Sequence, residues 1–177
     1  SFGTNNVQRF LGDGAGHFFD WDYPMIRWME SQGYDMTYVT SVDLETNSSL
    51  FTGHRVFVNT GHDEYYSDNM RARIQNAINS GVNMALFSAN NFYYRTVWSA
   101  NANGVANRRI HTDKNALAGS TTFEWRLLPP PLQHPENELG GVMLGGVAND
   151  RPFLVSDANS WIYAGTGLHT YTGNGTN

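Results

Sequence analysis

An apolar strand, an amphipathic helix and a second apolar strand follow one another in the middle of the chain, and this order constrains the fold most. Residues 54–60 and 82–87 have the short apolar character of strands that are buried on both faces. Between them, residues 68–80 place Met70, Ile74 and Ala77 at helical spacing, and Gly81 ends the helix. Two strands and a helix within about 30 residues predict a βαβ unit with a right-handed crossover. The sequence therefore predicts an α/β protein with a doubly wound, mostly parallel sheet.

The length of 177 residues suits a single domain with a sizeable core. We expect residues 1–177 to form one α/β domain with irregular Asn- and Gly-rich loops. A helix is expected from Tyr23 to about Gly33. Further strands are expected at residues 35–39, 109–111, 139–147 and 153–163. Because the chain stops in a tract rich in Gly, Thr and Asn, we expect it to be a fragment of a larger chain.

The composition excludes several classes of function. A net charge of −5 and the lack of any run of Lys and Arg argue against nucleic-acid binding, which requires a basic surface. No stretch of about 18 apolar residues is present, so no membrane-spanning helix is predicted. The absence of cysteine excludes disulfides, thiolate metal ligands and a cysteine nucleophile. A composition rich in Asn, Thr, Ser and Gly and poor in Lys is typical of many secreted or cell-surface proteins, and we expect that location.

Polar and ionisable side chains crowd the two turns that follow the predicted strands. The first turn, residues 61–67, contains His62, Glu64 and Tyr65, and the second, residues 88–94, contains Asn90 and Tyr93. Ligands of open α/β sheets bind at the carboxyl ends of the strands. We therefore expect the side chains of the two turns to meet above one edge of the sheet.

The tyrosines of these turns allow two interpretations. A phenolate is a hard oxygen donor, so Tyr65, Tyr93 and a carboxylate would suit a hard cation such as ferric iron. Alternatively, the tyrosines are amphipathic residues of the wall whose hydroxyls bond to the backbone. Both interpretations are open at this point, and spacing alone favours the second.

The ionisable residues of the first turn also have two interpretations. His62 and Glu64 could perform general acid–base chemistry near neutral pH. Asp63 and Ser67 are expected instead to cap the helix that follows. Asn90 occupies a sharp strand-to-helix turn, where Asn tolerates left-handed backbone and can orient a carbonyl ligand.

Several motifs of this chain follow one another in the same order as in one bacterial family. They comprise residues 19–28, 33–35, 42–44, 61–67, 90–94 and 135–139. With these motifs the chain resembles the C-terminal domain of the large (beta) subunit of N,N-dimethylformamidase. The resemblance extends over nearly the whole chain. It implies a fold like that of class I glutamine amidotransferases, with a flavodoxin-like sheet.

The resemblance also implies a site. In the characterised amidase, a mononuclear iron is held by two tyrosines and a glutamate, which here would be Tyr65, Tyr93 and an acid. Glu124 is the first choice for the acid, and Glu136 and Asp113 compete with it. His62, Glu64 and Asn90 would then act in catalysis or support the ligand tyrosines.

These observations lead to two hypotheses about function. The first is metal-assisted hydrolysis of a C–N bond in a small or carbohydrate-linked amide. The second is a secreted, non-catalytic module of the same fold that binds carbohydrate through residues such as Trp21 and Trp98 or belongs to a larger assembly. In either case we expect a small amide or carbohydrate ligand and contacts with other domains or subunits.

Overall fold

The computed structural model of the chain describes residues 16–115, 119–145 and 154–173. The chain divides into two compact units, residues 1–144 and 145–177, which are described separately. The predicted site residues all belong to the first unit.

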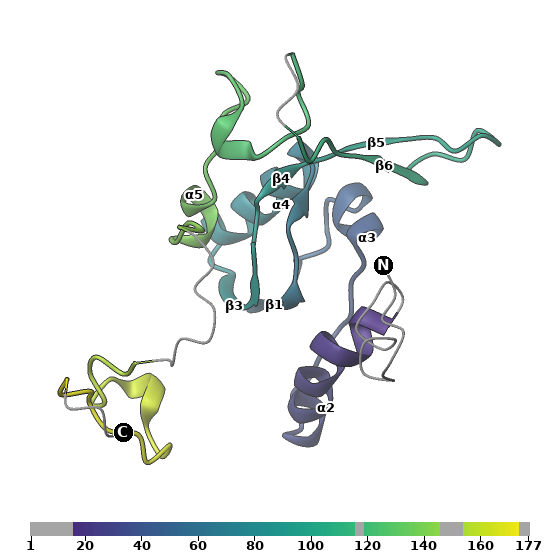
Figure 1. Cartoon of the computed structure of the whole chain (residues 1–177). Coiled ribbons are helices and arrows are strands. Elements are labelled where there is room, and N and C mark those ends of the chain that lie inside the picture. The colour runs from purple at the N-terminus through teal and green to yellow at the C-terminus, as the bar shows by residue number, and fades with distance from the viewer. Residues whose placement is uncertain (1–15, 116–118, 146–153, 174–177) are drawn as a thin grey trace, which may run out of the picture. The chain divides into compact units, whose positions relative to one another are not determined.

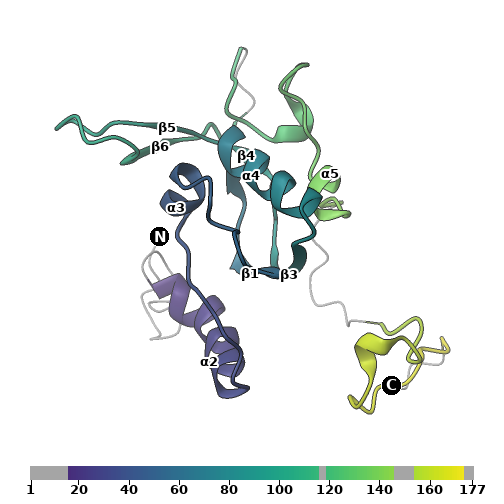
Figure 2. The ribbon, with the colours of Figure 1, turned by 180° about the vertical axis from the view of Figure 1, so that it is seen from behind.

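A βαβ unit forms the centre of the first unit (Figures 1 and 2). Strand β1 (Val56–His62) is followed by helix α4 (Asp68–Asn79) and strand β3 (Asn83–Ala89). The two strands pair in parallel, in a register that runs from Val56 opposite Asn83 to His62 opposite Ala89. The predicted strand–helix–strand order is thereby confirmed. Among the described residues this sheet has two strands, so the doubly wound sheet and the amidotransferase-like fold stay predictions.

Two shorter strand pairs continue from the βαβ unit. Strand β2 (Tyr65–Tyr66) pairs in parallel with β4 (Tyr94–Arg95), directly beyond the ends of β1 and β3. Strand β5 (Val97–Ser99) pairs antiparallel with β6 (Arg109–His111), which confirms the strand expected at residues 109–111. Figure 1 shows β5 and β6 extending away from the centre as an arm.

Helices account for most of the remaining regular structure. The first unit contains η2 (Phe18–Asp22), α2 (Tyr23–Ser31), α3 (Ser41–Thr46), η3 (Trp125–Leu127) and α5 (Asn137–Gly140). Helix α2 confirms the helix expected from Tyr23, with Pro24 in its first turn. In the second unit, the described residues include the short helix η4 (Trp161–Tyr163).

Three expected strands are wrong wherever the structure describes them. Residues 35–39 have no regular structure, and neither do residues 141–145 nor 154–160. Helix α5 occupies the start of the segment expected as a strand at 139–147, and η4 occupies the end of the segment expected at 153–163. Residues 146–153 lie outside the described part. An apolar pattern becomes a strand only where a partner strand satisfies its backbone groups, and the described residues provide none here.

The core lies between α4 and the sheet. Its fully or nearly buried members are Leu44, Tyr66, Met70, Ile74 and Phe92. Phe57, Met84 and Leu86 of the strands pack against this cluster. Burying an apolar side chain of this size contributes roughly 1.5–3 kcal/mol, so this contact is a main source of stability. A second cluster contains Phe123, Trp125 and Leu128.

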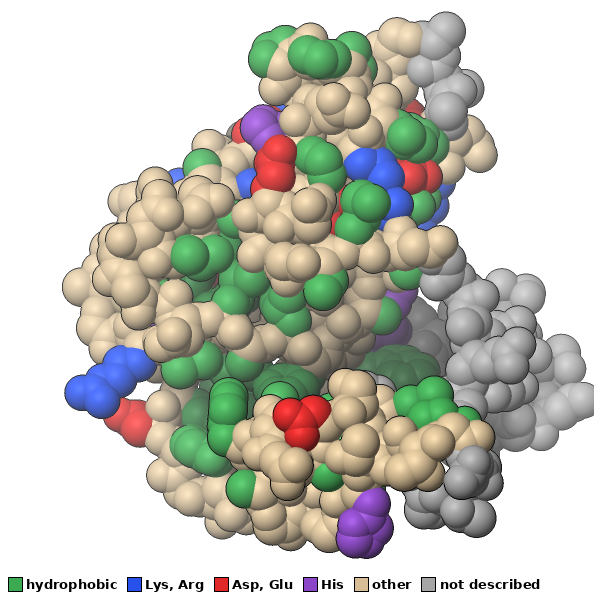
Figure 3. Space-filling model, turned by 90° about the vertical axis from the view of Figure 1, so that its left-hand side faces the viewer, with side chains coloured by type: hydrophobic (Ala, Val, Ile, Leu, Met, Phe, Trp, Pro, Cys, Tyr) green, Lys and Arg blue, Asp and Glu red, His purple; other side chains and the backbone are tan. Residues whose placement is uncertain are grey.

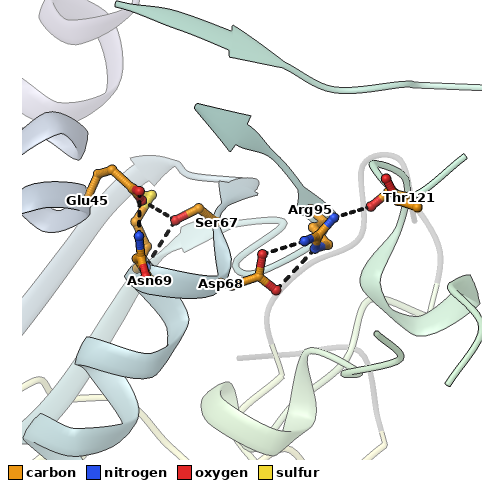
Figure 4. Close-up of polar contacts among 7 residues, drawn as sticks. Glu45, Ser67, Asp68, Asn69, Arg95 and Thr121 are labelled. Atoms are coloured by element: carbon orange, nitrogen blue, oxygen red, sulfur yellow. Dashed lines mark hydrogen bonds and ion pairs between the residues drawn. The ribbon is translucent and has the colours of Figure 1, made fainter. Parts of the chain in front are cut away.

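Polar contacts fix the start of α4 (Figure 4). Ser67 caps the helix by accepting a hydrogen bond from the amide of Met70 at 3.1 Å, as expected. The Ser67 hydroxyl donates in turn to Glu45, which also accepts from Asn69. Asp63 was expected to cap as well, and this expectation is wrong. Its carboxylate instead accepts a hydrogen bond from the hydroxyl of Tyr66 at 2.5 Å.

Arg95 joins this helix start to another segment of the chain. Its guanidinium binds both carboxylate oxygens of Asp68, at 3.2 and 2.5 Å, and donates to the carbonyl of Thr121 at 2.6 Å. Figure 4 shows the guanidinium between these two partners. Because β4 carries Arg95, this contact holds residues near 121–124 beside β4, where one of the predicted ligand acids lies.

Candidate tyrosine–carboxylate site

Unusual backbone conformations build both turns at the strand ends. Gly61 has φ +73°, and a Cβ atom at this position would lie 2.6 Å from Oδ1 of Asp22. In the second turn, Asn90 has φ 55° and Phe92 has φ 61°. Asn tolerates this left-handed region, as expected for Asn90, but a bulky side chain is rare there and requires surrounding structure to hold it. Phe92 is fully buried and packs on Tyr66, with ring centroids 4.6 Å apart.

The strand register brings the three predicted catalytic residues together. Nδ2 of Asn90 lies 3.1 Å from Nε2 of His62 and donates to Oε2 of Glu64 at 3.4 Å. Asn90 therefore bridges the two ionisable side chains, and the amide of Tyr94 donates to the carbonyl of Glu64 at 2.6 Å. This grouping is a fact of the structure, whereas a catalytic role for the three residues stays a prediction.

Glu64 is a buried carboxylate that stays ionised. Burial alone would raise the pKa of its carboxyl, but hydrogen bonds from Tyr65, Lys114 and Asn90 outweigh burial and lower the pKa. The ammonium of Lys114 lies 3.2 Å from Oε1 of Glu64. At neutral pH Glu64 is thus a fixed negative charge at the edge of the site.

Three tyrosines form a row beside Glu64. The ring of Tyr65 stacks on that of Tyr94, with centroids 5.7 Å apart and an interplanar angle of 15°. Tyr94 in turn meets Tyr93 edge to face, with centroids 4.8 Å apart. The structure therefore places Tyr65 and Tyr93 in one aromatic row, but the residue that pairs with Tyr65 is Tyr94.

The hydroxyls of this row hold their protons tightly. Burial, followed by a hydrogen bond to Glu124, raises the pKa of Tyr93 to about 12. Burial and a hydrogen bond to Glu64 raise the pKa of Tyr65. Burial and the negative charge of Glu124 do the same for Tyr94. Without a strong cation nearby, all three phenols are neutral at physiological pH.

Glu124 is the candidate acid that contacts this row. A β-bridge pairs it antiparallel with Tyr94, and the amide of Trp125 donates to the carbonyl of Tyr93 at 2.9 Å. The guanidinium of Arg126 lies 4.9 Å from the ring centre of Tyr93, and its Nε lies 3.8 Å from Oε2 of Glu124. Backbone pairing, rather than proximity in sequence, brings this acid to the tyrosines.

The other two candidate acids are engaged elsewhere. Glu136 is buried and forms an ion pair with Arg126. Asp113 accepts hydrogen bonds from the hydroxyls of Ser120 and Thr122, at 2.6 and 2.9 Å, and these bonds lower the pKa of its carboxyl. Of the three acids, Glu124 therefore fits a site with Tyr93 best.

The donor chemistry of this cluster fits a hard cation. Across the described ranges, no group of three His, Asp or Glu side chains could hold a metal ion, so a metal here would need the tyrosines. Phenolate and carboxylate oxygens are donors that hard cations prefer. The carboxylate of Glu124 lies near enough to the hydroxyl of Tyr93 to help raise the pKa of that phenol.

Two charged neighbours of the predicted site residues were missed in the sequence analysis, and the position of a third neighbour, Tyr94, was not predicted. Lys114 and Arg126 place a positive charge beside Glu64 and Glu124 respectively. Tyr94 was considered only as a wall residue, yet it lies between the two predicted ligand tyrosines. One signal for Lys114 was available, because it is the single lysine of the chain.

Two cavities adjoin the candidate site. One of about 380 Å³ is lined by Tyr65 and Asp63 together with Ser41, Thr96, Trp98, Ile110 and Thr112. Another of about 340 Å³ has His62, Asp63 and Asp22 among its lining residues. Asp63 lines both cavities, and burial raises the pKa of its carboxyl. Their volumes match those of sites for small molecules.

The surface of the protein carries few charges. Figure 3 shows one face on which Lys, Arg, Asp and Glu side chains are sparse and hydrophobic side chains emerge in several separate places. Exposed aromatic side chains include Trp21, at 58% exposure, and Trp161, at 85%. Within the described residues, no helix combines the length and the apolarity needed to cross a membrane.

Together, a βαβ unit and a row of tyrosines and carboxylates beyond its strand ends define a class of α/β domain with a polar site at the edge of its sheet. Residues 5–176 match the family described as N,N-dimethylformamidase beta subunit-like, C-terminal, and the chain belongs to this family. The resemblance inferred from the motifs is thereby confirmed. No curated protein matches the chain.

Proposed function

We propose that this domain supports metal-assisted hydrolysis of a C–N bond in a small amide, with the metal held by Tyr65, Tyr93 and Glu124. The observation that carries the proposal is the contact of Tyr93 with Glu124 in the same aromatic row as Tyr65. Membership of a family named after an amide hydrolase supports the same chemistry.

A hard cation at these oxygens would polarise the amide carbonyl and lower the pKa of a bound water. The residues of the chain then have distinct tasks. Glu64, ionised and close to Tyr65, would accept a proton from the attacking water and return it to the nitrogen of the leaving amine. Asn90 keeps Glu64 and His62 oriented toward each other. Arg126, which forms its shorter ion pair with Glu136, also places positive charge near Glu124 and Tyr93. Lys114 places positive charge beside Glu64.

The raised pKa values make metal binding dependent on pH. Tyr65 and Tyr93 must each release a proton to become ligands, so binding releases protons and strengthens as the pH rises. This behaviour distinguishes a tyrosinate site from adventitious binding by surface carboxylates, which are already ionised at neutral pH.

Elemental analysis and visible spectroscopy of the purified protein test the proposal. We expect near-stoichiometric iron, with a tyrosinate-to-metal absorption band that Tyr65→Phe and Tyr93→Phe each abolish. Tyr34→Phe, at an exposed tyrosine away from the row, is the control and should keep both iron and band. Protein that folds normally and still binds no metal after supply of ferric iron would refute the metal site.

The second candidate is a non-catalytic module that stacks aromatic side chains on sugars or on other subunits. The exposed Trp21 supports it, and the words "beta subunit-like" in the family description suggest assembly with further subunits. On this view the domain is part of a secreted assembly. Glycan binding that Trp21→Ala abolishes, in protein that takes up no metal, would favour this candidate over the hydrolase.

A further inference from the structure

The single lysine of the chain contacts a carboxylate and two aromatic rings, a combination that recognises organic cations. Nζ of Lys114 lies 3.2 Å from Oε1 of Glu64, 4.9 Å from the ring centre of Tyr65 and 5.5 Å from that of Tyr94. A cation within about 6 Å of an aromatic ring centre is attracted to the face of that ring. Lys114 is therefore held by one carboxylate and two stacked rings.

The carboxylate of this contact is buried and its two rings are partly buried, whereas the lysine is largely exposed. The side chain of Glu64 is 10% exposed and that of Lys114 is 58% exposed. Glu64 and Tyr94 are joined by a backbone hydrogen bond of 2.6 Å, and Tyr65 and Tyr94 are paired strand residues. Lys114 lies outside the helices and strands. The lysine can therefore withdraw into water while the carboxylate and rings keep their positions.

We propose that Glu64, Tyr65 and Tyr94 form a binding site for the organic ammonium group of a ligand, which Lys114 fills as an intramolecular occupant. The ligand class is a small alkylammonium compound with a short apolar stem. The ring faces and Glu64 recognise it, and the hydroxyl of Tyr65, which interacts with both Glu64 and Lys114, lies at the edge of the same site.

A cavity provides space for the rest of such a ligand. Tyr65 lines the cavity of about 380 Å³ together with Trp98, Ile110 and Thr112. The indole and isoleucine suit carbon atoms, and the threonine hydroxyl suits a polar substituent. The carboxylate fixes the charged end of the ligand, and the cavity selects for its size.

Competition with Lys114 sets the expected affinities. A ligand binds only the fraction of molecules in which the lysine has withdrawn, so its apparent affinity falls by that fraction. Lys114→Met removes the ammonium and keeps a flexible apolar stem. If Lys114 occupies the site in about nine of ten molecules, this substitution lowers the apparent dissociation constant of the ligand about tenfold.

Titration of the purified protein with n-butylammonium chloride, followed by NMR shifts of the tyrosine rings, tests the proposal. This probe has the four-carbon stem and ammonium of lysine, and n-butanol at equal concentration is the neutral control. We expect weak binding to the wild type, binding about tenfold tighter to Lys114→Met, and unchanged weak binding to Lys114→Arg, which keeps a cation.

A second variant distinguishes recognition of the ligand's positive charge from apolar contact alone. In a Lys114→Met background, Glu64→Gln removes the negative charge with little change of shape and should abolish the tightened binding. Equal affinities of wild type and Lys114→Met would overturn the proposal, as would equal binding of n-butanol. Circular dichroism of each variant confirms that the fold is intact. Since no metal or turnover is involved, this result is distinguishable from failure of the proposed hydrolase.

Discussion

Replacing Gly61 with alanine tests how the first turn of the site is built. Gly61 has a left-handed backbone, and an added Cβ would meet Oδ1 of Asp22 at 2.6 Å. That oxygen also accepts a hydrogen bond from Oγ1 of Thr60 at 2.7 Å. The Asp22 side chain can therefore move away from an added Cβ only by breaking this hydrogen bond. The end of β1 contacts η2 at a distance that only glycine permits.

The expected loss of stability follows from four terms. A left-handed alanine costs roughly 1–2 kcal/mol, and the stiffer unfolded chain offsets about 0.4–1 kcal/mol of that. Loss of the Thr60–Asp22 hydrogen bond adds about 0.5–1.5 kcal/mol, and forcing extra volume into a packed site adds about 1–3 kcal/mol. We expect Gly61→Ala to lower the free energy of unfolding by roughly 1.5–6 kcal/mol.

Gly33 is a matched control, because it has φ +76° and no neighbouring atom within 4 Å of the added Cβ. Gly33→Ala should therefore lower the free energy of unfolding only by the cost of a left-handed alanine, about 1 kcal/mol. Urea unfolding followed by tryptophan fluorescence measures both variants. In an Asp22→Ala background, where the clash is gone, Gly61→Ala should cost no more than Gly33→Ala. Equal losses for the two glycines in the wild-type background would refute the reasoning.

Three further predictions concern charge and capping. The pKa of Glu64 in the folded protein is below its ordinary value, so the ionised carboxylate stabilises the fold above the ordinary pKa. This stabilisation is lost as the pH falls through the folded-state pKa. The difference in free energy of unfolding between wild type and Glu64→Gln, measured by urea unfolding, should therefore narrow only in acid. Tyr93 has a folded-state pKa of about 12 against an ordinary 10.0, so its contribution is lost as the pH rises between these values. Wild type should lose more stability there than Tyr93→Phe, and parallel pH profiles would contradict this. Ser67→Ala removes the cap of α4 and should cost about 1 kcal/mol, measured by thermal unfolding, whereas Ser80→Ala, at the other end of the helix, should cost less.

Local patterns in the sequence were sufficient for the βαβ unit and for the contents of its two turns. Helix α4 follows from the spacing of Met70 and Ile74, and its start follows from Ser67. The same local reasoning failed at residues 35–39, where an extended apolar segment stays unpaired among the described residues. Strand formation depends on a partner that may be distant in sequence, and apolar pattern alone does not supply one.

The family, the two polar turns and their tyrosines could be predicted from motifs of residues close together in the chain. The assembly of the site depends on the fold. A β-bridge selects Glu124 over two competing acids, the strand register sets Tyr94 against Tyr65, and Lys114 reaches Glu64 across 50 residues. These contacts depend on backbone pairing between distant segments, and local periodicity carries no information about that pairing.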